Sequence, residues 1–299
     1  MFFERNEFIE PTLRHLKYFL AVAEDLHFRK AAERLYISQP GLSRQIKQLE
    51  EELGFPLFER TNKKVSLTKP GEYLKKEVHL ILRNLDGIIA HAHYLHEGIE
   101  GEIKFGYVGS AMQNVLPNLL LRIREKNKNI HFNLKEMENP DQIDALLAQE
   151  IDLGFVRLKR VPRGLKIHPV FEDTFSLVLP EDHVINKGNF KNLSQLKNEN
   201  FILFEQSYSP DYFDQVMQIF KDSGFLPAIS HHTVHATTIF KLVENNFGVS
   251  LVPSALQIGY SGNIKFIELV KIKQRTVLSV AWNSGNRNPI LHKVLENIL

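Results

Sequence analysis

Two short helices separated by a polar turn are predicted within residues 27–60, HFRKAAERLYISQPGLSRQIKQLEEELGFPLFER, and no other stretch constrains the fold as strongly. Apolar residues recur there at the i, i+3, i+4 and i+7 spacing of an amphipathic helix. The first set is Phe28, Ala31, Ala32 and Leu35, and the second is Leu42, Ile46, Leu49 and Leu53. Two such helices in sequence are typical of a helix-turn-helix.

Polar residues fit the two ends and the outer face of the second helix. Ser38 is placed to cap its N-terminus, Pro40 falls in the first turn, where a missing N–H is harmless, and Gly54 follows its end. Three residues fall off the apolar stripe and are expected to face outward: Ser43, Arg44 and Lys47. An earlier helix capped by Thr12 would complete a three-helix core. Its expected inward residues are Leu13, Leu16, Phe19, Leu20 and Ala23.

Positive charge is concentrated at the start of these helices and again just beyond them. From Arg29 to Lys47 there are five cations against one acid, and from Arg60 to Lys76 there are six against one. Two cations on a helix usually mean an ordinary solvated face, but this clustering suits a groove contact flanked by phosphate contacts. Residues 60–71 have a two-strand hairpin pattern around polar turn residues, which predicts the wing of a winged helix.

Three segments of this region match a known family: LRHLKYFLAVAE, FRKAAERLYISQPGLSRQIKQLEEELGFPLFER and VSLTKPGEYL. They resemble the DNA-binding domain of LysR-type transcriptional regulators. The resemblance implies contacts to bases or backbone from Ser38, Gln39, Pro40, Ser43 and Arg44, and contacts to phosphates from Arg60 and Lys64. The clustered cations Arg29, Lys30 and Lys47 are expected to join these contacts. Most members of the family have Ser or Thr where Arg29 stands.

A second apolar pattern, with heptad spacing, follows the wing. Its members lie alternately four and three residues apart and are Leu74, Val78, Ile81, Leu85, Ile88, Ala92 and Leu95. A helix packed on its own domain is one interpretation, but so narrow a seam favours a helix paired with a copy of itself. In LysR-type proteins this is the linker helix. The resemblance therefore implies a dimer, paired again into a tetramer, on a two-fold-related DNA site.

Two groups of histidines raise the alternative of a metal site: His91, His93 and His96, and then His231, His232 and His235. Only side chains three or four residues apart share a helical face, so His93 and His96 could pair while His91 points elsewhere. His231 and His232 would alternate across a strand. The pattern therefore favours ordinary solvated histidines, and we expect no metal or cofactor.

Composition excludes several classes of protein. The 299 residues suffice for two or three domains, 43% of them are hydrophobic, and the net charge of +2 requires any nucleic-acid footprint to be local. There are no cysteines, which removes disulfides, thiolate metal sites and cysteine nucleophiles. The start, MFFERNEFIEPT, does not fit a signal peptide, and no window is apolar enough for a membrane span. A soluble, cytoplasmic protein is expected.

Beyond Gly98 and Gly101 short β-rich runs alternate with amphipathic helices. EIKFGYVGS, VLPNLLLRIREKN, IHFNLKEM, QIDALLAQE and IDLGFVRL predict a βαβαβ arrangement, which is that of a parallel sheet with crossover helices. A second set extends from FEDTFSLVLP to FGVSLVP, and the strands NIKFIEL and TVLSVAWN and a final helix close the chain. Two α/β lobes indicate a binding module whose ligand lies at the carboxyl ends of strands.

The segments VGS, EMEN and GFVRLK follow the first three strands of this region. They resemble the LysR branch that controls aromatic-compound catabolism, whose members bind a small effector between two lobes similar to periplasmic binding proteins. The resemblance implies a benzoate- or muconate-type effector, that is, an aromatic or dicarboxylic acid. The chain departs from this branch at Asn139, where the branch has Thr, and in residues 205–209, EQSYS.

Six residues are expected around the effector: Ser110, Asn139, Arg157, Ser207, Ser209 and Pro253. Ser110 would begin a helix and offer its hydroxyl to a carboxylate, and Arg157 ends an apolar strand, where it could pair with an acid. The alternative for Arg157 is a surface ion pair, and for Asn139, Ser207 and Ser209 it is a cap or turn. Phe204 is expected in the core rather than against the ligand.

Three classes of function fit part of the chain. The α/β half alone would permit a solute-binding protein, but that class has an export signal and no helix-turn-helix. An enzyme is opposed by the absence of a GxSxG nucleophile elbow, a phosphate-binding glycine loop and HExxH. The favoured class is an effector-gated transcriptional regulator that binds double-stranded DNA and acts on RNA polymerase.

The expected architecture has three parts. A winged helix-turn-helix spans residues 12–70, a dimerising linker helix spans 71–98, and a two-lobed α/β effector-binding domain spans 101–299. Lobe I would hold about residues 101–172 and 275–299, and lobe II about residues 173–274.

Overall fold

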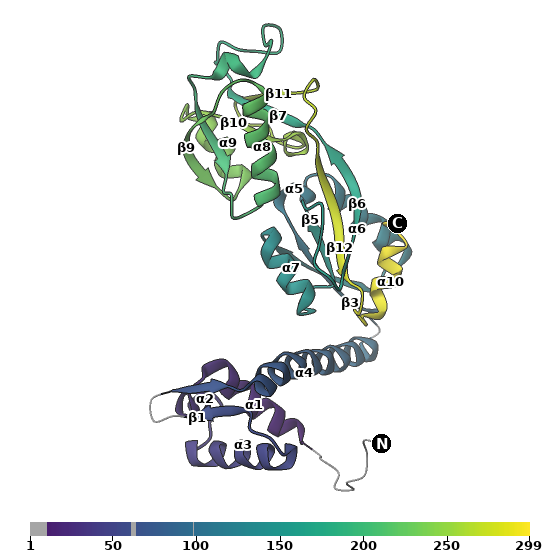
Figure 1. Cartoon of the computed structure of the whole chain (residues 1–299). Helices are drawn as coiled ribbons and strands as arrows, with labels where there is room; N and C mark the ends of the chain where they lie inside the picture. The colour runs from purple at the N-terminus through teal and green to yellow at the C-terminus, as the bar shows by residue number, and fades with distance from the viewer. Residues whose placement is uncertain (1–10, 61–63, 98) are drawn as a thin grey trace. The chain divides into compact units, whose positions relative to one another are not determined.

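The computed structural model describes residues 11–60, 64–97 and 99–299, which form two units that meet in sequence at Ala90 and His91 (Figure 1). The first unit contains three short helices, a hairpin and the beginning of a long helix. These elements are α1 (Leu13–Asp25), α2 (Phe28–Arg34), α3 (Gln39–Leu53), β1 (Phe58–Arg60), β2 (Val65–Leu67) and α4 (Lys69–His96).

The ends of α1 and α3 are formed by the residues predicted for them. The Thr12 hydroxyl accepts a hydrogen bond from the His15 N–H at 3.2 Å, and the Ser38 hydroxyl accepts one from the Gly41 N–H at 3.3 Å. Gly54 ends α3 in the left-handed conformation, with φ of 79°. These caps satisfy backbone groups that the helices leave open.

The core of the first unit differs from expectation at one position. Phe19, Val22, Ile46 and Leu49 are fully buried, but Leu13 is 42% exposed. The buried stripe of α1 is centred on Phe19 and Val22, and Leu13 lies off that stripe at the start of the helix. The prediction that Leu13 faces inward was therefore wrong.

The predicted wing is present, with shifted bounds. Strands β1 and β2 pair antiparallel from Phe58 with Leu67 to Arg60 with Val65. The hairpin begins at Phe58, two residues before the predicted range of 60–71. It ends earlier than predicted because the Thr68 hydroxyl accepts a hydrogen bond from the Gly71 N–H at 3.1 Å and so caps the start of α4. Residues 61–63 of the predicted turn lie outside the described residues.

Helix α4 carries the predicted heptad seam. Val78 is buried in the core of the first unit, and Leu74 and Leu82 pack against that core. Farther along the seam, Ile81, Ile88 and Leu95 are 55%, 58% and 59% exposed. The seam therefore packs within the unit at its beginning only.

The first half of the second unit has the predicted βαβαβ order. Its elements are β3 (Gly101–Tyr107), α5 (Gly109–Met112), α6 (Val115–Lys126), β4 (Ile130–Glu136), α7 (Asn139–Leu147) and β5 (Leu153–Val156). Strand β3 pairs in parallel with both β4 and β5, which confirms the predicted parallel arrangement. The complete sheet, in the order β4-β3-β5-β12-β6, is mixed, since β12 (Thr276–Asn283) is antiparallel to β5 and to β6 (Leu165–Asp173).

The second sheet has the order β11-β7-β10-β8-β9. Its strands and the remaining helices are β7 (Phe175–Pro180), η1 (Leu193–Leu196), β8 (Asn200–Phe204), α8 (Pro210–Asp222), β9 (Ala228–Thr233), α9 (Ala236–Glu244), β10 (Val249–Pro253), η2 (Ser254–Gln257), β11 (Ile264–Glu268) and α10 (Pro289–Leu295). Residues 171–180, predicted as one strand, are divided between β6 of the first sheet and β7 of the second. The chain crosses from one sheet to the other at Thr174.

Each sheet is the centre of a lobe with its own core. One core is built on Phe105, Phe155 and Val280 of the first sheet, and the other on Phe175, Phe201 and Leu251 of the second. We call the lobe of the first sheet lobe I and that of the second lobe II. The chain passes between them twice, at Thr174 and between β11 and β12, so the carboxyl ends of strands from both sheets lie near these crossings.

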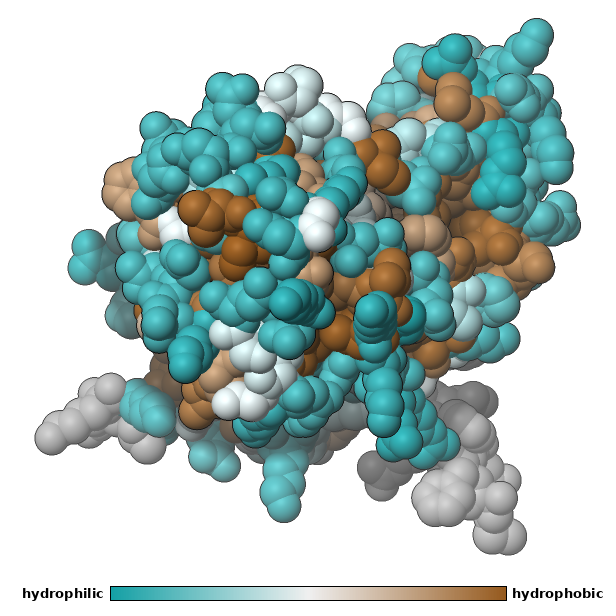
Figure 2. Space-filling view, turned by 90° about the horizontal axis from the view of Figure 1, so that it is seen from above, coloured by the Kyte–Doolittle hydropathy of each residue, from teal (hydrophilic) through white to brown (hydrophobic). Residues whose placement is uncertain are grey.

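On the face drawn in Figure 2, hydrophilic side chains cover most of the area, and hydrophobic ones gather in patches between them. None of the helices within the described ranges combines the length and hydrophobicity needed to cross a lipid bilayer.

Candidate functional site

The outer face of α3 presents a row of polar side chains. Ser38, Gln39 and Pro40 at its start are exposed, and the Gln39 side-chain amide donates to the Ser43 hydroxyl at 3.0 Å. Arg44 is exposed and makes no hydrogen bond or ion pair with the residues that the structure describes. An exposed arginine that is not engaged within its own domain is available to a base edge or a phosphate.

The cations around this face are held in surface ion pairs. The pairs are Arg29 with Glu33 at 3.0 Å, Lys30 with Asp25 at 3.5 Å and Lys47 with Glu51 at 3.4 Å. The three cationic side chains are 71–79% exposed, and the pairs of Arg29 and Lys47, whose acids are also exposed, contribute little to stability. At Arg29 and Lys47 a phosphate can therefore replace the acidic partner at low cost.

Arg60 is fixed more firmly than the other cations. Its guanidinium lies 4.5 Å from the centre of the Phe28 ring and 3.2 Å from the Glu50 carboxylate. That carboxylate also accepts hydrogen bonds from the N–H groups of Leu57 and Phe58, at 2.8 and 3.0 Å. Arg60 is thus positioned beside the wing, whereas Lys64 is an exposed residue just before β2.

One exposed aromatic side chain near α3 was not identified from the sequence. Tyr36 is 96% exposed and has a φ of 56°, in the turn directly before Ser38. A large aromatic residue in a left-handed turn conformation is uncommon. Its position between the two helices, off both of their apolar stripes, was the only sequence signal that could have drawn attention to it.

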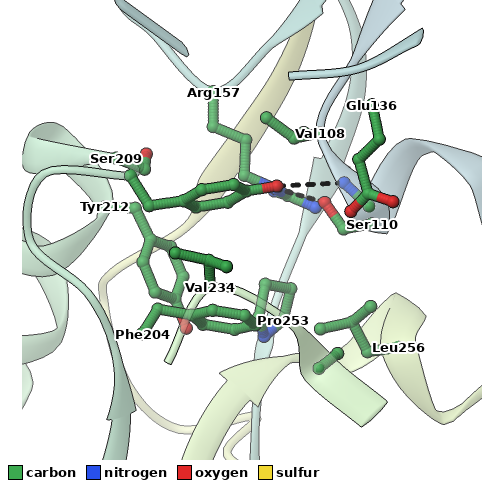
Figure 3. A pocket seen from close by; sticks show the side chains of 13 residues that line it. Val108, Ser110, Glu136, Arg157, Phe204, Ser209, Tyr212, Val234, Pro253 and Leu256 are labelled. Atoms are coloured by element: carbon green, nitrogen blue, oxygen red, sulfur yellow. Dashed lines mark hydrogen bonds between the residues drawn. The ribbon is translucent and has the colours of Figure 1, made fainter. Parts of the chain in front are cut away.

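A cavity in the second unit lies where the two lobes meet (Figure 3). The empty space that it encloses, open solvent at its mouth included, is about 410 Å³. Its lining comes from both lobes and consists of Val108, Gly109, Ser110, Glu136, Arg157, Phe204, Tyr208, Ser209, Tyr212, Val234, Ala236, Pro253 and Leu256.

Arg157 is the central polar group of this cavity. Its Nε donates to the Ser110 hydroxyl at 2.9 Å, its Nη1 to the Thr276 hydroxyl at 2.9 Å, and its Nη2 lies 3.4 Å from an Asp173 carboxylate oxygen. The residue is 6% exposed, so the surface ion pair considered as an alternative is not what the structure contains. Burial raises the pKa of Asp173, while the positive charge of Arg157 opposes that rise.

Two of the six expected effector-binding residues lie outside the cavity lining. Asn139 is fully buried. Its side-chain Nδ2 donates to the Ser209 hydroxyl at 2.7 Å, and its side-chain Oδ1 accepts from the backbone N–H of Arg157 at 3.1 Å. Ser207 is exposed. The other four, Ser110, Arg157, Ser209 and Pro253, line the cavity. The hydrogen bond from Asn139 to Ser209 joins the two places where the sequence departs from the aromatic-catabolism branch.

An aromatic wall faces these polar groups. The rings of Phe204 and Tyr208 are stacked with centres 6.1 Å apart, and Phe204 meets Tyr212 edge to face at 5.8 Å. Phe204, expected only in the core, is part of the lobe II core and of the cavity lining. Burial raises the pKa of both tyrosines, so their hydroxyls are neutral at physiological pH.

One acid that lines the cavity lies beside a histidine that does not. Glu136 ends β4 in lobe I, His235 precedes α9 in lobe II, and the Glu136 carboxylate lies 3.7 Å from His235 Nδ1. Elsewhere, His93 pairs with Glu97 at 3.3 Å. Across the described ranges, no group of three or more His, Asp or Glu side chains is arranged to hold a metal ion.

Comparison with known families covers both units. The family described as the LysR substrate binding domain matches residues 96–299. The family described as the bacterial regulatory helix-turn-helix protein, lysR family, matches residues 13–72. The chain belongs to the LysR family. It is therefore a DNA-binding transcriptional regulator with an effector-binding domain, and not an enzyme.

Individual relatives of this LysR regulator agree with that assignment. The HTH-type transcriptional regulator BenM of Acinetobacter baylyi is 32% identical over 96% of this chain and 94% of its own length. Full-length CbnR in complex with its target DNA has a TM-score of 0.69 at 28% identity, over 96% of this chain and 98% of CbnR. The BenM effector-binding domain with its effector benzoate has a TM-score of 0.59 at 27% identity, over 67% of this chain and 91% of that domain.

Proposed function

We propose that this LysR regulator binds a small carboxylic acid in the cavity between its lobes. The bound acid changes how a DNA-bound dimer, paired into a tetramer, acts on RNA polymerase. The observation that carries the proposal is Arg157. A guanidinium has five N–H groups, and in Arg157 the described residues accept from three of them. We propose that a carboxylate that enters the cavity accepts from the other two.

The rest of the cavity supports an effector with an apolar, planar body. Phe204 and Tyr212 provide aromatic surface opposite Arg157 (Figure 3), and Tyr208 adds a third ring to the lining. The solved relative that contains benzoate binds an acid of this chemistry. An aromatic carboxylate would place its ring on the aromatic wall and its charge at Arg157.

Titration of the full-length chain with benzoate and with muconate tests the proposal. We expect either acid to raise the thermal unfolding temperature of the effector-binding domain and to alter the gel mobility of the complex with the chain's own upstream DNA. A ligand raises the temperature only by binding the folded state. If neither acid changes either measurement at millimolar concentration, the proposed effector class is wrong.

Binding of α3 to DNA gives a prediction for Arg44. Arg44→Ala is expected to weaken binding to the upstream site by about 1–3 kcal/mol, the range for a base-reading arginine, without changing effector binding. The measurement is fluorescence anisotropy with the specific site and with a random duplex at several salt concentrations. Arg124→Ala, which removes an exposed arginine from α6, is the matched control. Equal weakening on both duplexes would make Arg44 a phosphate contact instead.

The exposed part of the α4 seam supports the dimer. Ile81, Ile88 and Leu95 recur at heptad spacing and remain exposed in the single chain, as an unpaired coiled-coil face would. We propose that a second copy covers them, which would give a two-fold dimer. The residues that contact DNA would then be repeated on both halves of the binding site.

The seam gives a second prediction. Ile88→Asp places a charge on the proposed interface and is expected to raise the dimer dissociation constant by at least about a hundredfold, the effect of losing roughly 3 kcal/mol. Analytical ultracentrifugation measures the change. Ala90→Asp adds the same charge to an exposed residue on the opposite side of the heptad and should leave the dimer intact. Equal effects of the two variants would contradict the proposed seam.

A further inference from the structure

Two of the residues that line the cavity carry a formal charge, Arg157 and Glu136. The positive charge of Arg157 is already matched by Asp173 at 3.4 Å. Glu136 has no such internal partner, since its neighbour His235 is 3.7 Å away and 59% exposed. An acid that enters the cavity therefore meets Arg157 together with an additional carboxylate.

The backbone brings the Glu136 carboxylate close to the wall of the cavity. A Cβ atom at Gly109 would lie 2.8 Å from Glu136 Oε1, so the carboxylate lies directly against the Gly109 backbone. Figure 3 shows Glu136 and Arg157 on the same side of the cavity, with Ser110 between them, and Phe204 and Tyr212 across from them. Both charged groups therefore line the same cavity as the aromatic residues.

The two charged residues bind different chemical groups of a ligand. Arg157 offers N–H donors and suits a carboxylate, whereas the Glu136 carboxylate only accepts. An unsubstituted acid such as benzoate has nothing to donate to Glu136 and places like charges near each other. A hydroxyl or amino group on the ring would donate a charge-assisted hydrogen bond in the same place.

We infer that Glu136 is a specificity-determining residue, and that it selects a hydroxy- or amino-substituted carboxylic acid over the unsubstituted acid. This inference rests on the proposed function, because Arg157 must hold the carboxylate. The ligand class is a planar apolar body with a carboxylate for Arg157 and a hydrogen-bond donor for Glu136. The position of the donor on the ring is left to the isomer series in the experiment.

The experiment is calorimetric titration of the full-length chain with matched acids. The series is benzoate, the three hydroxybenzoates, the three aminobenzoates and the three methoxybenzoates, which have similar substituents without an O–H or N–H donor. The preferred hydroxy or amino isomer is expected to bind at least about tenfold more tightly than benzoate and than its methoxy counterpart. A hydrogen bond to a charged group supports a difference of this size.

Variants at Glu136 then assign the preference to its carboxylate. Glu136→Ala is expected to bring the affinity ratio between the preferred isomer and benzoate to about one, while benzoate binds as tightly as before or more tightly. Glu136→Gln keeps the size of the side chain and is expected to reduce the ratio. The matched control is Glu138→Ala, which removes a nearby carboxylate that does not line this cavity and should leave the ratio unchanged.

The outcomes distinguish failure of the inference about Glu136 from failure of the proposed function. If benzoate binds but donor-bearing isomers gain nothing, or if Glu136→Ala keeps their advantage, this inference is overturned and the proposed function stands. If Glu136 only ties the lobes together through His235, then Glu136→Ala and His235→Ala will change the affinity for every acid by the same factor, which also overturns it. If no acid in the series binds the wild-type chain, the proposed function fails, and the inference fails with it.

Discussion

Arg157→Met is expected to abolish the response to a carboxylate effector and to destabilise the effector-binding domain by about 3–5 kcal/mol, the cost of breaking a buried ion pair on one side. The substitution removes the donors proposed for the effector. It also leaves the buried Asp173 carboxylate without its cation and the hydroxyls of Ser110 and Thr276 without their donor. The effect on stability arises because buried charge without a partner is costly.

Calorimetric unfolding of the full chain measures this loss. The unfolding transition of the effector-binding domain should fall in Arg157→Met, while affinity for DNA is retained at a temperature below that transition. Adding Asp173→Asn removes the unpaired charge but keeps an acceptor for the Ala255 N–H, now bound at 3.2 Å, so the double variant should recover much of the stability without the response. A double variant less stable than Arg157→Met would contradict this account. Arg124→Met serves as the exposed control.

Gly71→Ala is expected to destabilise the DNA-binding domain by about 3 kcal/mol, the upper end for forcing an added methyl into a packed site. A Cβ at Gly71 would lie 2.2 Å from the carbonyl oxygen of Leu57. That oxygen belongs to the backbone just before the wing, and it also accepts a hydrogen bond from the Thr68 N–H at 3.0 Å. Neither the start of α4 nor the hairpin can therefore move aside without loss.

Gly87→Ala in the same helix is the matched control. Beyond the adjacent residues and the backbone of the helix itself, none of the described atoms lies within 4 Å of a Cβ at Gly87, so the substitution should stabilise α4 by about 0.5–1 kcal/mol, as alanine does in a helix interior. Calorimetry of both variants, together with their binding to the upstream duplex at 25 °C, measures the contrast. Similar stabilities in the two variants would show that the Leu57 carbonyl accommodates the methyl group.

The helical part of the fold was predictable because its signals are local. The apolar spacing from Phe28 to Leu53, the Ser38 cap and the Gly54 end all act within a few residues, and each is present. The errors came from longer-range packing. Leu13 is exposed because the neighbouring helices cover another side of α1. Strand β6 was missed because residues 165–173 show no clean alternation, and the run that follows enters a different sheet.

The candidate site was predictable only in part, for the same reason. Ser110 and Arg157 were found because they follow buried strands of one sheet, whose ends gather near the ligand in this class of fold. The partners of Arg157 could not be found this way, since Thr276 is 119 residues away in sequence. Tyr208 and Tyr212 reach the cavity from the other lobe, and no spacing rule connects them to Arg157.

The two lobes contribute different side chains to the cavity. The charged residues Glu136 and Arg157, with Ser110, come from lobe I, and the aromatic residues Phe204, Tyr208 and Tyr212 come from lobe II. A molecule that satisfies only one half gains little from bringing the lobes to a particular arrangement, and an equilibrium shifts only by differential affinity. Acetate offers the charge without the ring, and benzyl alcohol offers the ring without the charge. Such half-ligands are expected to act as antagonists, which compete with the inducer for the cavity without reproducing its effect on transcription.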